Sequence, residues 1–243
     1  MAKAKQICAC TPSLGLVSMW WARQFTNLLW PLNMGRQVMM KHDSVGGEIA
    51  ETRNSIVVDC LNLETDSLEV DSLFWVDDDV LLTRGALVQL YSHHKPIVAG
   101  CYFTKSDPSI PLLFPERMGG TAPFVPNKVV PMWGVGMGVT LVKMDVYKAL
   151  IPKVGRDKYG RPEWYRTNRE YKVEDGMLDC GGTEDLFFCE LAAKEGITPI
   201  ADCSKHAFGW HHDRETGQGY PKEQFDQWKS AKQIVWPDGT VWE

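Results

Sequence analysis

The first hundred residues alternate between short apolar runs and longer segments with helical spacing of apolar residues. Strands are predicted at 5–10, 37–41, 72–76 and 96–102, and helices at 16–29, 48–63 and 84–93. This order predicts an α/β fold with a largely parallel sheet covered by helices on both faces. In such sheets, ligands bind beyond the carboxyl ends of the strands.

Length and composition favour one large domain that needs no disulfides. The chain has 243 residues and 44% hydrophobic content, enough for a single core. It has no run of about 20 apolar residues and no apolar signal-peptide core near its start, so we expect no membrane span and a cytoplasmic location. Seven cysteines, an odd number scattered along the chain, are typical of reduced thiols.

Three consecutive carboxylates follow the apolar run at 73–76: Asp77, Asp78 and Asp79. Buried unpaired charge is costly, so a strand that ends in clustered acids indicates a cation or a donor-rich ligand, and a divalent metal is the expected one. Because alternate side chains of a strand share a face, Asp77 and Asp79 are predicted to converge while Asp78 points elsewhere. The alternative is a solvated acidic turn before the next helix.

The second half of the chain is less regular. Residues 106–131 are rich in Pro and Gly and are predicted to be a loop, and Gly134, Gly136 and Gly138 alternate just after it. Their spacing is not a phosphate-binding fingerprint, and such glycines favour close approach of a substrate or another backbone. Segment 153–172 holds seven Lys or Arg residues against three Asp or Glu, interleaved with aromatic residues.

Two further groups carry candidate chemistry. Thr183, Glu184 and Asp185 follow a glycine pair, where they suit either an ordinary helix start or a general base beside a cleft. His206 lies in a late segment, with His211 close behind, and imidazole is a ligand for manganese. A zinc site built from Cys180, Cys189, Cys203 and His206 is a weaker alternative, because only the last two have ligand-like spacing.

Taken in order, these pieces resemble a GT-A glycosyltransferase, and most closely the large inverting family that includes cellulose and chitin synthases. The resemblance rests on an Arg53-Asn54 helix, the aspartate strand, the glycine loop at 133–138, the acid pair and the late histidine. It spans roughly residues 5–210. Two features depart from that family: the loop at 9–13 lacks the Asn-containing run of many members, and the chain has no transmembrane channel region or Gln-x-x-Arg-Trp motif.

The resemblance implies a role for each matched residue. Thr11, Pro12 and Arg53 would line the nucleotide pocket, Asp77 would meet the ribose or the metal, and Asp78, Trp133 and Gly134 would complete donor binding. Asp79 and His206 would hold Mn²⁺ or Mg²⁺, with His211 as the alternative ligand. Asp185 would be the catalytic base, and Glu184 would help to hold the acceptor.

The implied reaction is metal-dependent, inverting transfer from a nucleotide-sugar, with a UDP-sugar as the expected donor. The expected domain is 1–243, with a donor half at 1–105, an acceptor half at 106–212 and an extension of helix and hairpin at 213–243.

The acceptor remains open between a glycan or lipid-linked hydroxyl and a hydroxymethylated DNA base, as in some phage enzymes. A net charge of −5 argues against strong non-specific duplex binding. The basic aromatic segment 153–172 could bind a nucleic acid, but it also suits an ordinary solvated surface loop, which is the preferred interpretation. The other classes left open are a nucleotidyltransferase and a non-catalytic metal-binding or sugar-binding module.

Overall fold

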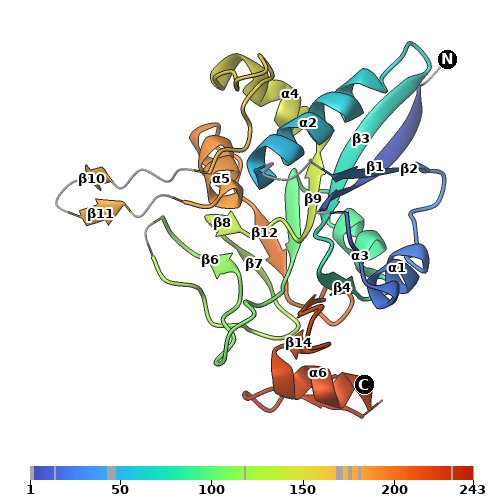
Figure 1. Cartoon of the computed structure of the whole chain (residues 1–243), viewed down its shortest axis with the longest axis vertical. Helices are drawn as coiled ribbons and strands as arrows, with labels where there is room; N and C mark the ends of the chain where they lie inside the picture. Colours follow the sequence, from blue (N-terminus) through green and yellow to red (C-terminus); the bar gives the residue numbers. More distant parts are fainter. Residues whose placement is uncertain are drawn as a thin grey trace.

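The computed structural model describes residues 3–13, 15–42, 48–117, 119–167, 172–174, 177–179, 182–230 and 232–242. A seven-stranded sheet lies at the centre, in the order β2-β1-β3-β9-β5-β12-β7 (Figure 1). Its strands are β1 (Ala4–Ser13), β2 (Gly35–His42), β3 (Leu68–Val76), β5 (Ile97–Gly100), β7 (Val129–Pro131), β9 (Val139–Lys143) and β12 (Ile200–Asp202).

Five of these strands run in one direction, whereas β9 and β7 run opposite to their neighbours. The helices that flank the sheet are α1 (Met19–Thr26), α2 (Ile49–Asn62), α3 (Ala86–Ser92), α4 (Met144–Leu150) and α5 (Glu184–Lys194). The predicted fold class, a mostly parallel Rossmann-like α/β sheet covered by helices, is therefore confirmed. Apolar periodicity does not encode strand direction, so the antiparallel β9 between β3 and β5 was not foreseen.

The predicted helix at 16–29 is shorter in the structure, where α1 begins only at Met19. Ser18 is its N-cap, and the Ser18 hydroxyl accepts a hydrogen bond from the Trp21 N–H at 3.0 Å. The predicted loop at 106–131 contains two strands, β6 (Leu113–Phe114) and β7. Short two- and three-residue strands carry too little periodicity to be recognised in sequence.

Small sheets carry the segments around the end of β3. The strand β4 (Val80–Leu82) pairs with β13 (Gly209–His212), and β13 pairs with β14 (Gly219–Tyr220). The strand β8 (Gly134–Val135) pairs with β6, and β10 (Lys172–Glu174) pairs with β11 (Met177–Asp179). The β4–β13 pairing brings residues near position 210 to the acidic turn.

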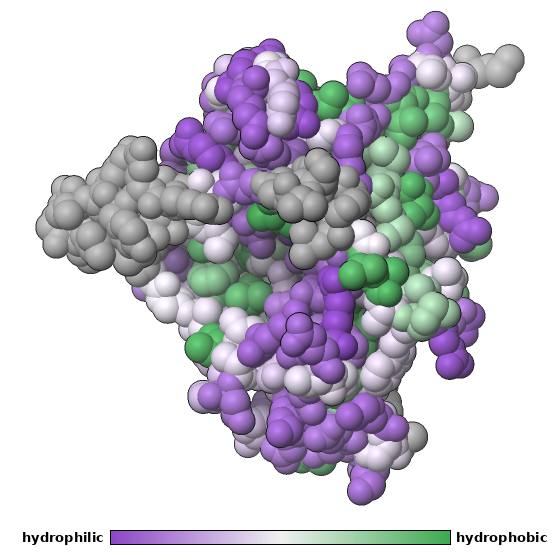
Figure 2. Space-filling view, in the orientation of Figure 1, coloured by the Kyte–Doolittle hydropathy of each residue, from purple (hydrophilic) through white to green (hydrophobic). Residues whose placement is uncertain are grey.

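The C-terminal extension packs against the rest of the chain through aromatic rings, and its outer surface, at the bottom of the space-filling view, is mostly hydrophilic (Figure 2). It comprises α6 (Lys222–Lys229) and the predicted hairpin, which forms as β15 (Ile234–Val235) and β16 (Val241–Trp242). Trp236 lies 4.3 Å from Phe124 and Trp242 lies 5.3 Å from Phe208, measured between ring centroids. These contacts join the hairpin to the segments that follow β6 and β12.

The expectations of reduced cysteines and of no membrane span can be compared directly with the structure. All six cysteines in the described ranges are free thiols, and each of them is buried. Within the same ranges, no helix is long and apolar enough to cross a membrane.

Candidate active site

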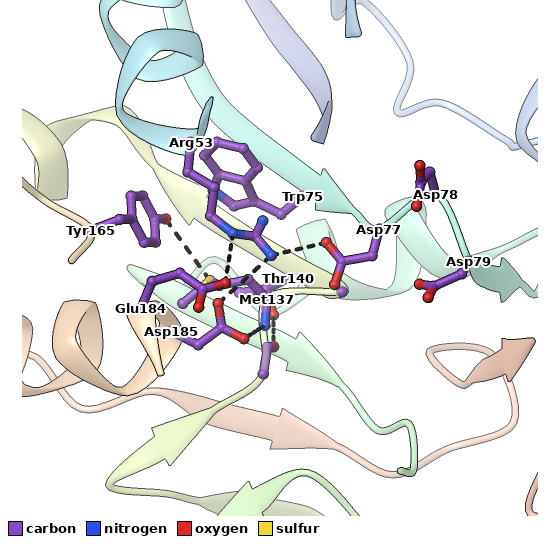
Figure 3. Close-up of polar contacts among 12 residues, drawn as sticks. Arg53, Trp75, Asp77, Asp78, Asp79, Met137, Thr140, Tyr165, Glu184 and Asp185 are labelled. Atoms are coloured by element: carbon purple, nitrogen blue, oxygen red, sulfur yellow. Dashed lines mark hydrogen bonds and ion pairs between the residues drawn. The ribbon is translucent and has the colours of Figure 1, made fainter. Parts of the chain in front are cut away.

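The three aspartates form a tight turn rather than the end of a strand. The strand β3 ends at Val76, and the Val80 N–H donates to the Asp77 carbonyl at 3.1 Å. The Trp21 indole N–H also donates to that carbonyl, at 2.9 Å. Ideal strand alternation therefore does not apply beyond Val76, and Asp77 is directed at Arg53 whereas Asp78 and Asp79 lie apart from it (Figure 3).

A separate cation neutralises each of the three carboxylates. Arg53 Nη2 donates to Asp77 Oδ1 at 2.9 Å. Arg214 pairs with Asp78, which also accepts a hydrogen bond from the Ser13 hydroxyl at 2.6 Å. Asp79 Oδ2 lies 2.5 Å from Lys105 Nζ and 3.4 Å from His211 Nε2. The solvated acidic turn is therefore too simple a description, because all three carboxylates are held by basic side chains.

Arg53 is the centre of the site. It lies on α2, its side chain is 1% exposed, and its guanidinium faces the rings of Trp75 and Tyr165 at 5.2 and 5.9 Å from their centroids. The same guanidinium is 3.5 Å from Glu184 Oε1 and 3.7 Å from Asp185 Oδ1, so it meets three carboxylates (Figure 3). Its Nη1 atom is buried and has no hydrogen-bond partner among the described residues.

The carboxylic acid side chains around Arg53 and the acidic turn have shifted pKa values. Burial raises the pKa of Asp185 well above its usual value, although Arg53 opposes this, and the neighbouring Glu184 and Asp77 raise it further. Burial also raises the pKa of Asp77, again against the effect of Arg53. For Asp79, burial is outweighed by His211 and Lys105, so its pKa is lowered. Asp185 is thus the stronger base, whereas Asp79 is an ionised carboxylate near neutral pH.

Backbone groups of the glycine loop orient Asp185. The Met137 N–H donates to Asp185 Oδ2 at 3.0 Å, while Oδ1 is buried and accepts no hydrogen bond from the described residues. Asp185 is in the first turn of α5, and the Thr183 hydroxyl at its N-cap makes no capping bond. One carboxylate oxygen of Asp185 is therefore fixed by the backbone, and the other lies 3.7 Å from the Arg53 guanidinium.

The glycines of this loop allow close packing against a buried tyrosine. A Cβ at Gly136 would lie 2.4 Å from the Tyr102 hydroxyl, and one at Gly138 would lie 2.8 Å from its Cζ and 3.0 Å from Asp77 Oδ2. The Gly138 N–H donates to that hydroxyl at 3.0 Å. The alternating glycines of the sequence are thus explained by the close approach of Tyr102 and the acidic turn.

The other predicted donor-binding residues are spread around this centre. Thr11 and Pro12 are buried near the end of β1, next to β3, and the Thr11 hydroxyl has no hydrogen-bond partner among the described residues. Gly134 lies in β8, where a Cβ would be 2.7 Å from the Leu186 side chain on α5, and the half-buried Trp133 precedes it. An unpartnered hydroxyl at a strand end is suited to a polar ligand.

The structure brings His211, rather than His206, to the aspartates. His211 pairs with Val80 across β13 and β4, and its Nδ1 lies 2.8 Å from the Phe103 carbonyl. His206 is exposed, and its carbonyl accepts from the Thr83 hydroxyl at 2.6 Å. Thr83 is four residues beyond Asp79, roughly 13 Å along an extended chain.

The side chains near the acidic turn provide part of a ligand set for a divalent cation. Asp79 and His211 offer an oxygen and a nitrogen, but no group of three or more His, Cys, Asp or Glu side chains in the described ranges is arranged to hold a metal. The zinc alternative gains no support there, and Cys180 lies outside these ranges. Magnesium sites often use one or two carboxylates and complete the shell with substrate phosphates. A cation at Asp79 would have to displace Lys105.

In its described part, 153–167, the basic aromatic segment is partly packed into the core, whereas the sequence suggested either a base-stacking surface or a solvated loop. Trp164 and Tyr165 are fully buried, so their rings have no free face for a base, and among the aromatic residues of 153–167 Tyr159 alone is well exposed. Asn54 holds this segment, with its side chain bonded to both the N–H and the carbonyl of Tyr165 at 2.9 and 2.8 Å. Residues 168–171 lie outside the described ranges.

Several site residues were missed in the sequence. Lys105 and Arg214 neutralise aspartates from loops, and Tyr165 covers the Arg53 guanidinium. None has a local pattern that marks it. The Arg53-Asn54 pair was the one sequence signal related to Tyr165, because the side-chain amide of Asn54 binds the Tyr165 backbone.

Comparison with protein-family models gives no match, and neither does comparison with curated protein sequences. Among solved structures, 35 chains match. One of them, the crystal structure of A197 from STIV, has a TM-score of 0.54 and 14% sequence identity, over 97% of this chain and 92% of that chain. At this level of identity the likeness concerns the fold, which the two chains share over nearly their whole lengths.

Proposed function

We propose that this protein is a GT-A glycosyltransferase that moves a sugar from a nucleotide-sugar donor to an acceptor hydroxyl with inversion. The observation that carries the proposal is the group formed by the buried Arg53 and Glu184 with the half-buried Asp77 and Asp185, beyond the carboxyl end of β3. Ligands bind at this edge of such sheets. Buried ionisable groups with perturbed pKa values, gathered at one point, are typical of active sites rather than of packing.

Asp185 is the proposed general base. Its Oδ2 accepts from the Met137 N–H. Its Oδ1 is buried beside Arg53 without a hydrogen-bond donor among the described residues, and it is the oxygen proposed to take the proton once the acceptor hydroxyl is bound against it. As the acceptor oxygen forms its bond to the anomeric carbon, the bond from that carbon to the diphosphate breaks, and the diphosphate leaves on the opposite face. A raised pKa makes Asp185 a stronger base, and positioned bases contribute about 10² to 10⁴ in rate.

Arg53 is a positioning residue for both acids. It is buried between the Trp75 and Tyr165 rings and contacts Asp77 on one side and Asp185 and Glu184 on the other. Glu184 is proposed to hold the acceptor. Thr11 and Pro12 at the end of β1 are proposed to line the nucleotide pocket, with the unpartnered Thr11 hydroxyl available to the donor.

Asp79 and His211 would hold a divalent metal together with the donor phosphates. When bound, such a cation stabilises negative charge on the diphosphate leaving group. Mn²⁺ and Mg²⁺ are the candidates, because both accept oxygen ligands and Mn²⁺ also accepts imidazole. The lowered pKa of Asp79 keeps its carboxylate ionised for this role.

A panel of nucleotide-sugars with Mn²⁺ tests the proposal by thermal shift and by slow donor hydrolysis. A ligand at 100 times its Kd adds about 2.7 kcal/mol, or roughly 5 to 11 °C for a chain of this size. Asp79→Asn is expected to weaken metal-dependent donor binding, whereas Asp185→Asn should bind the donor normally and lose turnover. No shift with any nucleotide-sugar, or full turnover in Asp185→Asn, would refute the proposal.

The two histidines supply a matched pair for the metal site. His211→Ala should raise the metal concentration that gives half of the maximal rate, and His206→Ala should leave it unchanged, because only His211 lies beside Asp79. The opposite result would return the metal ligand to His206.

A further inference from the structure

A groove of about 890 Å³ lies between α1, the end of β4 and α6. These three elements lie close together in Figure 1, on the side of the molecule that carries the C-terminal extension. The groove is lined by two tryptophans, Trp20 and Trp228, three cations and the carboxamides Gln24 and Asn27. None of these residues belongs to the Arg53 cluster or to the proposed metal site.

The lining of the groove is basic in a chain whose net charge is −5. Arg23, Arg84 and Lys229 line it, and no Asp or Glu does. Lys229 has an exposed ion pair with Asp226, at 3.1 Å. Arg23 and Arg84 are both exposed and have no acidic partner within the part of the chain that the structure describes. Two free guanidinium groups therefore face this recess, and they would attract phosphates.

The aromatic wall of the groove is backed by further aromatic rings. The Trp20 and Trp228 rings stack at 5.6 Å with an interplanar angle of 13°, and both rings are only half-buried. Behind them, Phe225 packs at 5.6 Å from Trp20, and Trp210 stacks on Trp228 at 5.7 Å. Half-exposed rings fixed in this way are suited to stacking on flat aromatic ligands.

We infer that this groove binds a short stretch of single-stranded nucleic acid. Its bases would stack on Trp20 and Trp228, and its phosphates would meet Arg23 and Arg84. Neutral glycans lack the phosphates that the guanidinium groups would bind, and an anionic lipid headgroup lacks the flat rings. Aromatic faces combined with a basic groove are the features by which single strands are held without sequence preference.

The groove also adjoins the proposed site. Trp21, next to Trp20 on α1, donates to the Asp77 carbonyl, and the His212 N–H donates to the Asp79 carbonyl while its ring packs on Trp20 at 5.6 Å. If the proposed sugar transfer holds, a nucleic acid is the acceptor class that this groove favours. The binding itself does not depend on that reaction.

The test measures binding of a fluorescent 12-nucleotide oligothymidylate by anisotropy across a salt series, without donor or metal. In the double variant Arg23→Gln, Arg84→Gln, two lost phosphate contacts reduce the slope of log K against log salt by about 1.4, a loss of about 25-fold at 0.1 M salt. The lysine variants at both positions should restore the slope. Both arginines are exposed, and unchanged thermal unfolding would confirm that the variants fold.

The matched control removes the same charge elsewhere, by Arg156→Gln with Arg166→Gln in the segment 153–167, where both arginines are exposed. These control changes should leave the slope unaltered. An equal loss in the control, or no binding by the unmodified protein, would overturn the inference. Binding to vesicles with anionic lipids but not to the oligonucleotide would overturn it in favour of a membrane surface. Asp185→Asn should bind the oligonucleotide normally, which separates failure of this inference from failure of the proposed catalysis.

Discussion

Replacing Arg53 by methionine removes the one buried guanidinium that three buried or half-buried carboxylates share. The substitution keeps an apolar stem of similar length between the Trp75 and Tyr165 rings and leaves Asp77 and Asp185 without their cation. Breaking a buried pair in this way costs about 3 to 5 kcal/mol, because the remaining charges are uncompensated. For a chain of this size, that loss lowers the Tm by roughly 6 to 20 °C.

The loss should depend on pH in a definite direction. Burial raises the folded-state pKa of Asp77 and Asp185 above the unfolded value near 3.9, and Arg53 opposes the rise in both. Between the unfolded and the raised folded pKa, the native state binds more protons, so stability falls as pH rises through that window. Without Arg53 the folded pKa values rise further and the window extends upward. The deficit of Arg53→Met relative to the unmodified protein is therefore larger at pH 8 than at pH 5.

Urea unfolding followed by tryptophan fluorescence at pH 5 and pH 8 measures both effects. Arg53→Lys retains one positive charge and should lose less stability, although a lysine cannot reproduce the fork that reaches three carboxylates. Arg156→Met, at an exposed position, is the control for the loss of a guanidinium. A deficit below about 1 kcal/mol, typical of exposed pairs, or one equal at both pH values, would refute the view that Arg53 holds this cluster together.

Three more outcomes follow from the structure. Lys105→Met should lower the concentration of Mn²⁺ needed for half-saturation, because the Lys105 ammonium group is paired with the Asp79 carboxylate that would bind the metal. Titration calorimetry with the metal alone measures this affinity, and an unchanged affinity would contradict the reasoning. Gly138→Ala should cost about 1 to 3 kcal/mol in thermal unfolding, because its Cβ would crowd buried side chains. Gly120→Ala, where a Cβ meets nothing within 4 Å, serves as its control. Asp202→Asn should destabilise the protein at pH 7, and the difference should shrink as pH falls below about 4, because the folded pKa of Asp202 is lowered and its stabilisation is lost through that pKa. A difference that stays constant down to pH 2 would contradict this reasoning.

The regular elements of the first hundred residues were predictable because their apolar spacing is local. The segment at 48–63 forms α2, and the segment at 72–76 forms the end of β3, since burial of one helix face or of a whole central strand requires such patterns. Strand direction and the two- and three-residue strands were not predictable, because pairing partners far apart in the chain decide them.

The candidate site divides in the same way. Arg53, Asp185 and the aspartate triplet were identified from residue type and order, and the structure brings Arg53, Asp77, Glu184 and Asp185 together. The choice between His206 and His211 was not decidable in sequence. It depends on the register of β13 against β4, which places His211 opposite Val80, next to Asp79.

By itself, the sequence determined that an apolar strand ends in three carboxylates, and that an arginine helix and a later acid pair accompany them. Only the tertiary structure decided which cation each carboxylate meets: Arg53 from α2, and Arg214 and Lys105 from loops. The physical reason is that the hydrophobic pattern of a segment is local, whereas neutralising a buried charge requires an opposite charge nearby in space, and the chain can supply it from any position.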